Sequence, residues 1–182
     1  MKNVRKLKKL LIYLGITTSI LLLASGELNS KSTIPSHSPI LETTKTLIIT
    51  NPDIRLIKLL EEEGFTGEQN RVAWAIVKRE SNGIHNARNY NRNKTWDRGL
   101  FQINDVHLKI YNIKSPTQLF NPVQNVKIAY KISNGGTNFS AWALPNLDGS
   151  ITGYAKYLKE KSPSTYRKYY IKYKYYYNKY PL

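Results

Sequence analysis

The chain contains no cysteine among its 182 residues. Small exported domains commonly depend on disulfides, and that support is excluded here. The core must therefore hold together by packing alone, which about 110 ordered residues can achieve. The sequence also shows no internal repeat, so a solenoid or a propeller is not expected.

Long apolar runs are scarce as well. The longest, Leu10–Ala24, falls short of the about 20 residues that a membrane-spanning helix needs. Five Lys and Arg precede it within the first nine residues, and the small-x-small site Ala24-Ser25-Gly26 follows. This order predicts a signal peptide at residues 1–26 and a secreted or envelope protein, with a retained N-terminal anchor as the alternative. No cysteine follows the run, so lipoprotein processing is not expected.

Acidic residues are few: 12 Asp and Glu stand against 28 Lys and Arg, for a net charge of +16. The charge is uneven, because residues 153–182 hold eight bases and one acid, whereas residues 27–152 are nearly balanced. A strongly basic segment favours polyanionic partners. Residues 161–182 form a Tyr/Lys-rich basic tail with two interpretations: a binding segment for charged polymers, or a terminal helix that lays tyrosines on the domain.

Between these ends the sequence predicts a linker and then helices. Residues 27–50 are rich in Ser, Thr and Pro without periodicity, which is typical of a flexible linker. Residues 51–160 form the expected catalytic domain. Its predicted helices are Asn51–Gly64, a helix from a Thr66/Gln69 capping box to Glu80, Asp105–Tyr111, a helix from Asn121 to Gly135 with Val123, Val126, Ala129, Tyr130 and Ile132 inward, and Ile151–Glu160.

The second of these helices carries an acid on its apolar face. Val72, Ala73, Ile76 and Val77 follow the spacing of one buried face, and Glu80 falls on that face. A carboxyl group there is either paired, with Lys78 or Arg79 for example, or kept because burial raises its pKa. The second interpretation predicts a general acid that holds its proton near neutral pH.

A second acid follows 17 residues later. Asp97 precedes Gly99-Leu100-Phe101-Gln102-Ile103-Asn104, which alternates apolar and polar residues and predicts a short strand or a strand exit after a tight turn. Leu100 and Ile103 are expected on one side, with Gln102 and Asn104 on the other. Asp97 either faces a cleft, or caps a turn or pairs with Arg92 or Arg98.

These residues resemble the lysozyme-like superfamily. The resemblance is carried by Glu80-Ser81, Asn89 to Asn93 (NYNRN), Trp96 to Asn104 (WDRGLFQIN) and Leu119 to Val126 (LFNPVQNV), and it covers roughly residues 53–157. The sequence is most similar to bacterial lytic transglycosylases of the soluble type and to muramidases of phages and secretion systems. It is more distantly similar to animal lysozymes, whose disulfides it lacks.

The resemblance implies a mainly α (α+β) fold in which helices surround a small β-hairpin, here within 82–96, that walls a sugar cleft. It implies Glu80 as acid and Ser81 as its support, with Gln102 and Asn104 binding the N-acetyl group. Tyr90, as a ring that stacks on a sugar, and Trp142, beside Glu80, complete the expected substrate contacts. The alternatives for Tyr90 and Trp96 are surface and sheet packing, and Trp74 is expected in the core.

The implied substrate is peptidoglycan, cut at the β-1,4 bond between N-acetylmuramic acid and N-acetylglucosamine. Two reactions remain open: a lyase reaction with Glu80 alone, which forms a 1,6-anhydro end, and hydrolysis with Glu80 and Asp97 as the two catalytic residues. A non-catalytic wall-binding protein is the alternative from another class.

The expected partners follow from the same resemblance. They are glycan strands, with anionic wall polymers or a membrane surface at the basic tail, and no nucleic acid; a monomer is expected. The histidines have no ligand partners at useful spacing, and His85 and His107 are expected at the surface. Neither a metal nor a cofactor is predicted.

Overall fold

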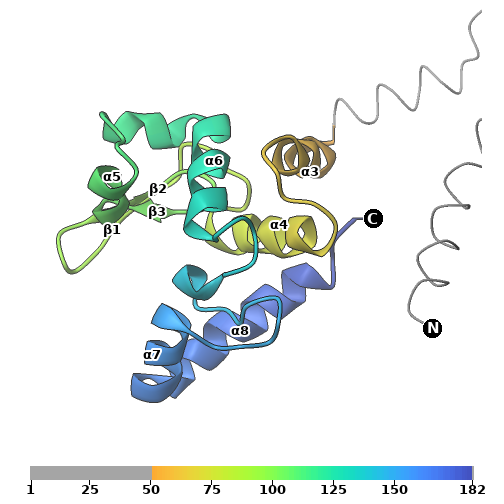
Figure 1. The fold of residues 1–182 in the computed structure, drawn as a ribbon, viewed down its shortest axis with the longest axis vertical. Helices are drawn as coiled ribbons and strands as arrows, with labels where there is room; N and C mark the ends of the chain where they lie inside the picture. Colours follow the sequence, from red (N-terminus) through yellow and green to blue (C-terminus); the bar gives the residue numbers. More distant parts are fainter. Residues whose placement is uncertain (1–50, 182) are drawn as a thin grey trace, which may run out of the picture. The chain divides into compact units, whose positions relative to one another are not determined.

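The computed structural model describes residues 51–181, so the predicted signal peptide (1–26) and the predicted linker (27–50) lie outside the described residues. The described part is mainly helical with one small antiparallel sheet, as expected (Figure 1). In chain order its elements are α3 (Pro52–Glu62), α4 (Glu68–Glu80), β1 (Arg88–Tyr90), β2 (Trp96–Arg98), β3 (Ile103–Asn104), α5 (Val106–Ile110), η1 (Pro116–Phe120), α6 (Pro122–Ile132), η2 (Ser140–Trp142), α7 (Gly153–Lys161) and α8 (Pro163–Tyr177).

Local capping fixes the bounds of α3. The Asn51 side chain accepts hydrogen bonds from the N–H groups of Asp53 and Ile54, and Pro52 opens the first turn. Gly64 follows the helix with φ +107°, a conformation that glycine adopts without strain. Both ends of this helix are confirmed.

The start of α4 differs from the prediction. Gly67 is the N-cap and no side chain caps the helix, although Gln69 Oε1 accepts from the Thr66 N–H at 3.5 Å. The predicted capping box is therefore only half present, because the Thr66 side chain does not cap the helix. The helix still ends at Glu80, as expected.

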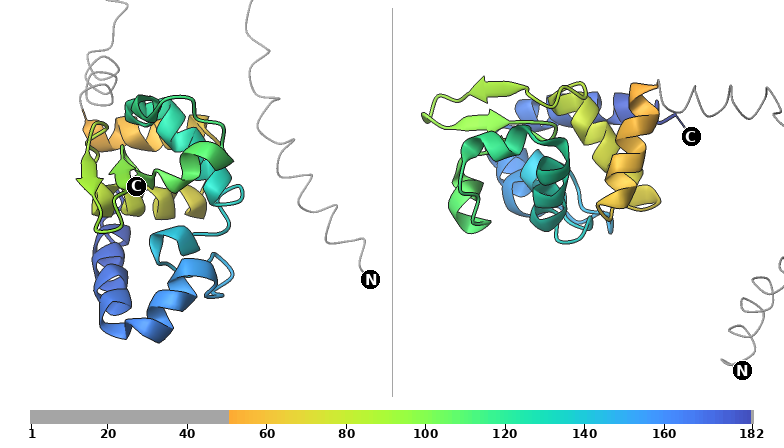
Figure 2. Two further views of the ribbon diagram at one scale, coloured as in Figure 1. Left: turned by 90° about the vertical axis from the view of Figure 1, so that its left-hand side faces the viewer. Right: turned by 90° about the horizontal axis from the view of Figure 1, so that it is seen from above.

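Helix α4 lies in the core of the domain. Its predicted apolar face, Val72, Ala73, Ile76 and Val77, is at most 5 % exposed. It packs between α3 and α8 (Figure 2). Trp74 is also buried in this core, as predicted.

The sheet has the order β1-β2-β3, and the hairpin predicted within residues 82–96 is confirmed as β1 and β2. Asp97 on β2 pairs with Asn89 on β1 and with Asn104 on β3. Of the two alternatives for residues 99–104, a strand along the whole run is wrong, whereas a short strand after a tight turn is present: residues 99–102 form a turn and Ile103–Asn104 is strand. The turn directs Leu100 and Phe101 into the core, where both are at most 3 % exposed.

Helix α6 begins at the predicted Asn121-Pro122 cap. Val126 and Ala129 are buried as expected, but Val123 lies in the first turn and is 36 % exposed, so its inward assignment is wrong. The buried residue near this end is polar: Asn125 is fully inaccessible to solvent.

The segment predicted as a basic tail forms the 15-residue helix α8 and lies against α4. Tyr173 is 8 % exposed, and burial raises the pKa of its hydroxyl well above the ordinary value. Tyr180, just beyond the helix, contacts the Trp74 ring edge-on at 5.7 Å and donates to Asn70 Oδ1 at 3.2 Å. The segment is thus a helix that lays tyrosines on the domain, and the binding of charged polymers by its exposed face stays a prediction.

Within residues 51–181, no helix combines the length and the hydropathy needed to cross a membrane.

Candidate active site

A cleft of about 820 Å³ separates the sheet from the helices. Glu80 at the end of α4, Asp97 on β2, and Gln102 and Asn104 around β3 all border it. Trp142 on η2 borders it from the helical side. Five of the seven predicted site residues are therefore brought together around one cavity.

Glu80 is the last residue of α4, and its side chain is 24 % exposed. Its surroundings are not purely apolar. Glu80 Oε1 accepts hydrogen bonds from Arg79 Nε at 3.0 Å and from Arg79 Nη2 at 2.5 Å. Of the pairings considered from the sequence, the one with Arg79 is present, while Lys78 pairs with Asp53 at 3.1 Å instead.

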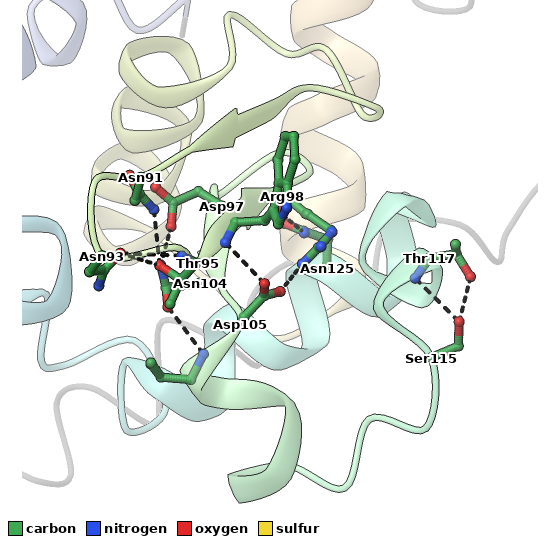
Figure 3. Close-up of polar contacts among 12 residues, drawn as sticks. Asn91, Asn93, Thr95, Asp97, Arg98, Asn104, Asp105, Ser115, Thr117 and Asn125 are labelled. Carbon is green, nitrogen blue, oxygen red and sulfur yellow. Dashed lines mark hydrogen bonds and ion pairs between the residues drawn. The ribbon is translucent and has the colours of Figure 1, made fainter.

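Asp97 faces the cleft from the middle of β2. Its Oδ1 accepts from Asn104 Nδ2 at 2.6 Å, and Figure 3 shows the two side chains turned toward each other. The turn-cap alternative is wrong because Asp97 lies in a strand, and Arg98 pairs with Asp105 instead.

Two predicted residues bond to the backbone of the turn at 99–102. Gln102, which has φ +50°, donates from Nε2 to the carbonyls of Gly99 at 3.0 Å and Ala87 at 3.2 Å. The Ser81 hydroxyl lies 2.8 Å from the Leu100 carbonyl and is nearly buried. Ser81 thus ties the end of α4, next to Glu80, to this turn.

Of the predicted aromatic contacts, only Trp142 borders the cleft, and its Nε1 donates to the Phe101 carbonyl at 2.9 Å. Tyr90 is 56 % exposed and packs on Trp96, with ring centroids 4.9 Å apart. Neither of these two rings lines the cleft. Trp96 packs on the sheet, one of its two predicted alternatives.

Residues 57–144 match a family model described as a lysozyme like domain. This segment belongs to the lysozyme-like superfamily. The matched segment is thereby related to glycosidase-type enzymes that act on peptidoglycan. Neither a curated protein nor a solved structure matches it. The match includes Glu80 and Asp97 and ends before α7 and α8.

The cleft of the lysozyme-like domain is also lined by residues that the sequence does not predict for the site, among them His107, Tyr154 and Tyr169. His107 was assigned to the surface, but burial lowers its pKa, an effect partly offset by the charge of Asp97. Burial is also the main cause that raises the pKa of Tyr154. Tyr169 belongs to α8, in the segment whose packing the sequence left open.

Asn125 is a further residue that the sequence does not predict for the site, and it holds backbone next to the cleft rather than lining the cleft itself. Its Oδ1 accepts from the Phe101 N–H at 2.9 Å, and its Nδ2 donates to the carbonyls of Leu119 at 2.8 Å and Arg98 at 3.0 Å. The one available signal was its place in LFNPVQNV, the stretch that resembles the family.

No group of three or more His, Asp or Glu in the described range is arranged to hold a metal ion. Chemically, the cleft offers a carboxyl group held by a guanidinium, a carboxylate held by an amide, and an indole. This set suits proton transfer to a bound saccharide.

Proposed function

We propose that the chain is a secreted lytic transglycosylase that cuts the β-1,4 bond between N-acetylmuramic acid and N-acetylglucosamine in peptidoglycan. The observation that carries the proposal is the position of Glu80, which ends α4 at the border of a cleft formed by the sheet and the helices of a lysozyme-like domain. A carboxyl group so placed can reach the glycosidic oxygen of a strand lying in the cleft.

In the proposed reaction, Glu80 donates its proton to the leaving oxygen as the bond to the anomeric carbon breaks. The 6-hydroxyl of the muramic acid then attacks that carbon and returns its proton to Glu80. The product carries a 1,6-anhydro ring, and water is not consumed. The sequence of steps needs one carboxyl group that acts as acid and then as base.

Asp97 supports this version because its Oδ1 is engaged by Asn104 and its strand is paired on both sides. The same residue keeps a second candidate in view, since it also borders the cleft. A carboxylate at that border can stabilise the sugar cation while water attacks, as in a hydrolytic muramidase. The mass of the products separates the two, because the anhydro product is lighter by one water.

The decisive variant is Glu80→Gln, which keeps the shape and removes the proton donor. We expect turnover of purified glycan strands to fall by about 100-fold or more, since a positioned acid contributes at least that much. Glu62→Gln, at an exposed position of α3, is the matched control and should retain full activity. Undiminished turnover by a folded Glu80→Gln protein would refute the mechanism. A wild-type protein that binds walls without cutting them would support the non-catalytic alternative.

The outward face of α8 supports a second contact with the wall. Arg167, Lys168 and Lys172 surround the exposed side chains of Ile171 and Tyr175 in a shallow groove. Because this face is cationic, its proposed partner is an anionic polymer of the wall.

The double substitution Arg167→Glu and Lys168→Glu reverses two charges of this face. It should weaken pelleting of the protein with intact walls in low salt. Cleavage of soluble strands should continue at the wild-type rate. Arg55→Glu with Lys58→Glu, at two exposed positions of α3, changes the net charge by the same amount and is the control. Unchanged pelleting of the double variant would exclude this face as the contact. If the wild-type protein binds vesicles of anionic lipid but not walls, the partner of this face is a membrane surface instead.

A further inference from the structure

The guanidinium of Arg79 is buried beside the proposed acid. Its side chain is 3 % exposed, although it comes from the last turn of α4, where an arginine can easily reach solvent. Burying a charge is costly unless it is paired and hydrogen-bonded. The partners of this guanidinium therefore indicate what its burial achieves.

Two N–H groups of Arg79 converge on one oxygen atom of Glu80. Nε and Nη2 both donate to Oε1, at 3.0 Å and 2.5 Å. A planar guanidinium that donates twice fixes direction as well as distance. The arrangement distinguishes the two oxygens of Glu80, because Oε1 accepts both bonds from Arg79, whereas Oε2 accepts no hydrogen bond from the described residues.

The guanidinium is itself anchored across the cleft's helical wall. Arg79 Nη2 also donates to the carbonyl oxygen of Trp142, at 2.6 Å. The end of α4 and the η2 turn are thereby joined through one side chain. The Glu80 carboxyl group is thus held relative to the wall on which a saccharide would lie.

Helix α8 covers this arrangement. The Tyr169 ring lies over the guanidinium, with 5.4 Å between its centroid and Cζ of Arg79. Lys172 Nζ donates to the Arg79 carbonyl oxygen at 3.2 Å. Both residues belong to the part of the chain beyond the matched segment 57–144.

We propose that Arg79 is a positioning residue for proton transfer: held by the Trp142 carbonyl and covered by Tyr169, it binds Oε1 of Glu80 and leaves Oε2 to carry the proton to the glycosidic oxygen. The inference rests on the proposed function. In the protonated acid, the carbonyl oxygen Oε1 still accepts from Arg79 while the Oε2 hydroxyl donates to the leaving oxygen. When the 6-hydroxyl returns a proton, it returns to the same Oε2.

Arg79→Met tests this because it keeps an apolar stem of similar length and removes every donor. We expect kcat on soluble glycan strands to fall by about 100-fold, the loss that misplacement of a reacting group by 1 Å can cause. KM should stay within about twofold, since Arg79 acts through Glu80 and not on the substrate. Arg79→Lys, which keeps the charge without the fork, should recover only part of kcat. Arg71→Met on the same helix is the control for losing an arginine that contacts α8.

A purely structural role is separated by two further measurements. The first is thermal unfolding of each variant, which must show that the proteins compared are folded. The second is addition of guanidinium ion, at about 50 mM, to Arg79→Ala; because that variant leaves a cavity beside Oε1, the free ion should restore part of kcat. Restoration by guanidinium and not by ammonium supports positioning.

The outcomes distinguish this inference from the function on which it rests. If Glu80→Gln is inactive while Arg79→Met keeps wild-type kcat, positioning by Arg79 is overturned and the proposed acid stands. If Glu80→Gln retains turnover, the proposed function fails first. Should Arg79→Met not fold, Arg79→Lys decides: wild-type kcat in that variant overturns the inference, and a selective loss of kcat supports it.

Discussion

Replacing Asn125 by alanine should destabilise the whole domain, although the residue touches neither the solvent nor the cleft. Its side chain makes three hydrogen bonds of 2.8–3.0 Å, all to backbone groups. They join α6 to the residue that ends β2, to the turn that follows it, and to η1. The substitution therefore disconnects four elements at one point.

The expected loss follows from these bonds. A typical intramolecular hydrogen bond contributes about 1 kcal/mol net, and a buried group left without a partner costs about 1–3 kcal/mol. For three bonds we expect the free energy of unfolding to fall by about 3–5 kcal/mol. Since a domain of this kind has about 5–15 kcal/mol in total, the variant should be marginal or unfolded at 37 °C.

The assay is urea unfolding of residues 27–182, followed by tryptophan fluorescence. Gln124→Ala is the matched control: it is adjacent on α6 but exposed, so its effect should stay within about 0.5 kcal/mol. Asn125→Asp adds a second comparison, because it keeps the acceptor for Phe101 and turns a carboxylate toward two carbonyl oxygens. A loss below about 1 kcal/mol in Asn125→Ala would refute the reasoning, since it would mean that water or a shifted backbone replaces all three bonds.

Two further substitutions test neighbouring features. Gly99→Ala should lower the free energy of unfolding by at least about 2 kcal/mol in the same assay. A Cβ at this position would lie 2.2 Å from the Leu119 carbonyl oxygen, and the residue has φ +76°. Gly149→Ala is the control for the backbone part of this loss, because Gly149 has φ +83° and open space around it. His107→Gln should flatten the pH dependence of stability below about pH 6.5: burial lowers the pKa of His107, so the unfolded state binds more protons there and wild-type stability falls with falling pH. Equal losses of unfolding free energy in Gly99→Ala and Gly149→Ala would contradict the first prediction. Identical pH profiles of stability for wild type and His107→Gln would contradict the second.

The parts of the fold that the sequence predicted correctly are those that depend on neighbouring residues. The start of α3 follows from Asn51 and Pro52, whose effects act within one helical turn. The buried face of α4 follows from a period of 3.6 residues. The hairpin was found through resemblance, which carries information that local propensity lacks.

The turn at 99–102 could not be predicted in the same way. Alternation of apolar and polar residues allows a strand or a strand after a tight turn there, and the bond that holds the observed turn is long-range: the Phe101 N–H donates to Asn125, which follows 24 residues later. A contact between residues so far apart in the sequence is not visible in the local order of apolar and polar residues. Gln102 in this turn has a positive φ, which is uncommon for a residue other than glycine.

The pairing at the proposed acid was considered from the sequence, but its geometry was not. Adjacent residues on a helix do not face each other, so Arg79 and Glu80 would point apart in the middle of α4. They meet because Glu80 is the last helical residue and because Trp142 and Tyr169 hold the guanidinium in place. Both of those contacts come from elements more than 60 residues away.

The backbone of Leu100 and Phe101 is the point at which these long-range contacts combine. Ser81 reaches the Leu100 carbonyl from the end of α4, Asn125 binds the Phe101 N–H from α6, and Trp142 Nε1 donates to the Phe101 carbonyl from η2. Each partner is at most 7 % exposed, so solvent competes little for the bonds. Two consecutive core residues next to Gln102, which borders the cleft, are thus fixed from three directions. Under the proposed function, this fixed backbone would let the elements that carry Glu80 and Asp97 keep one separation when a glycan strand binds, and reactions that depend on placing a proton within a fraction of an ångström require that constancy.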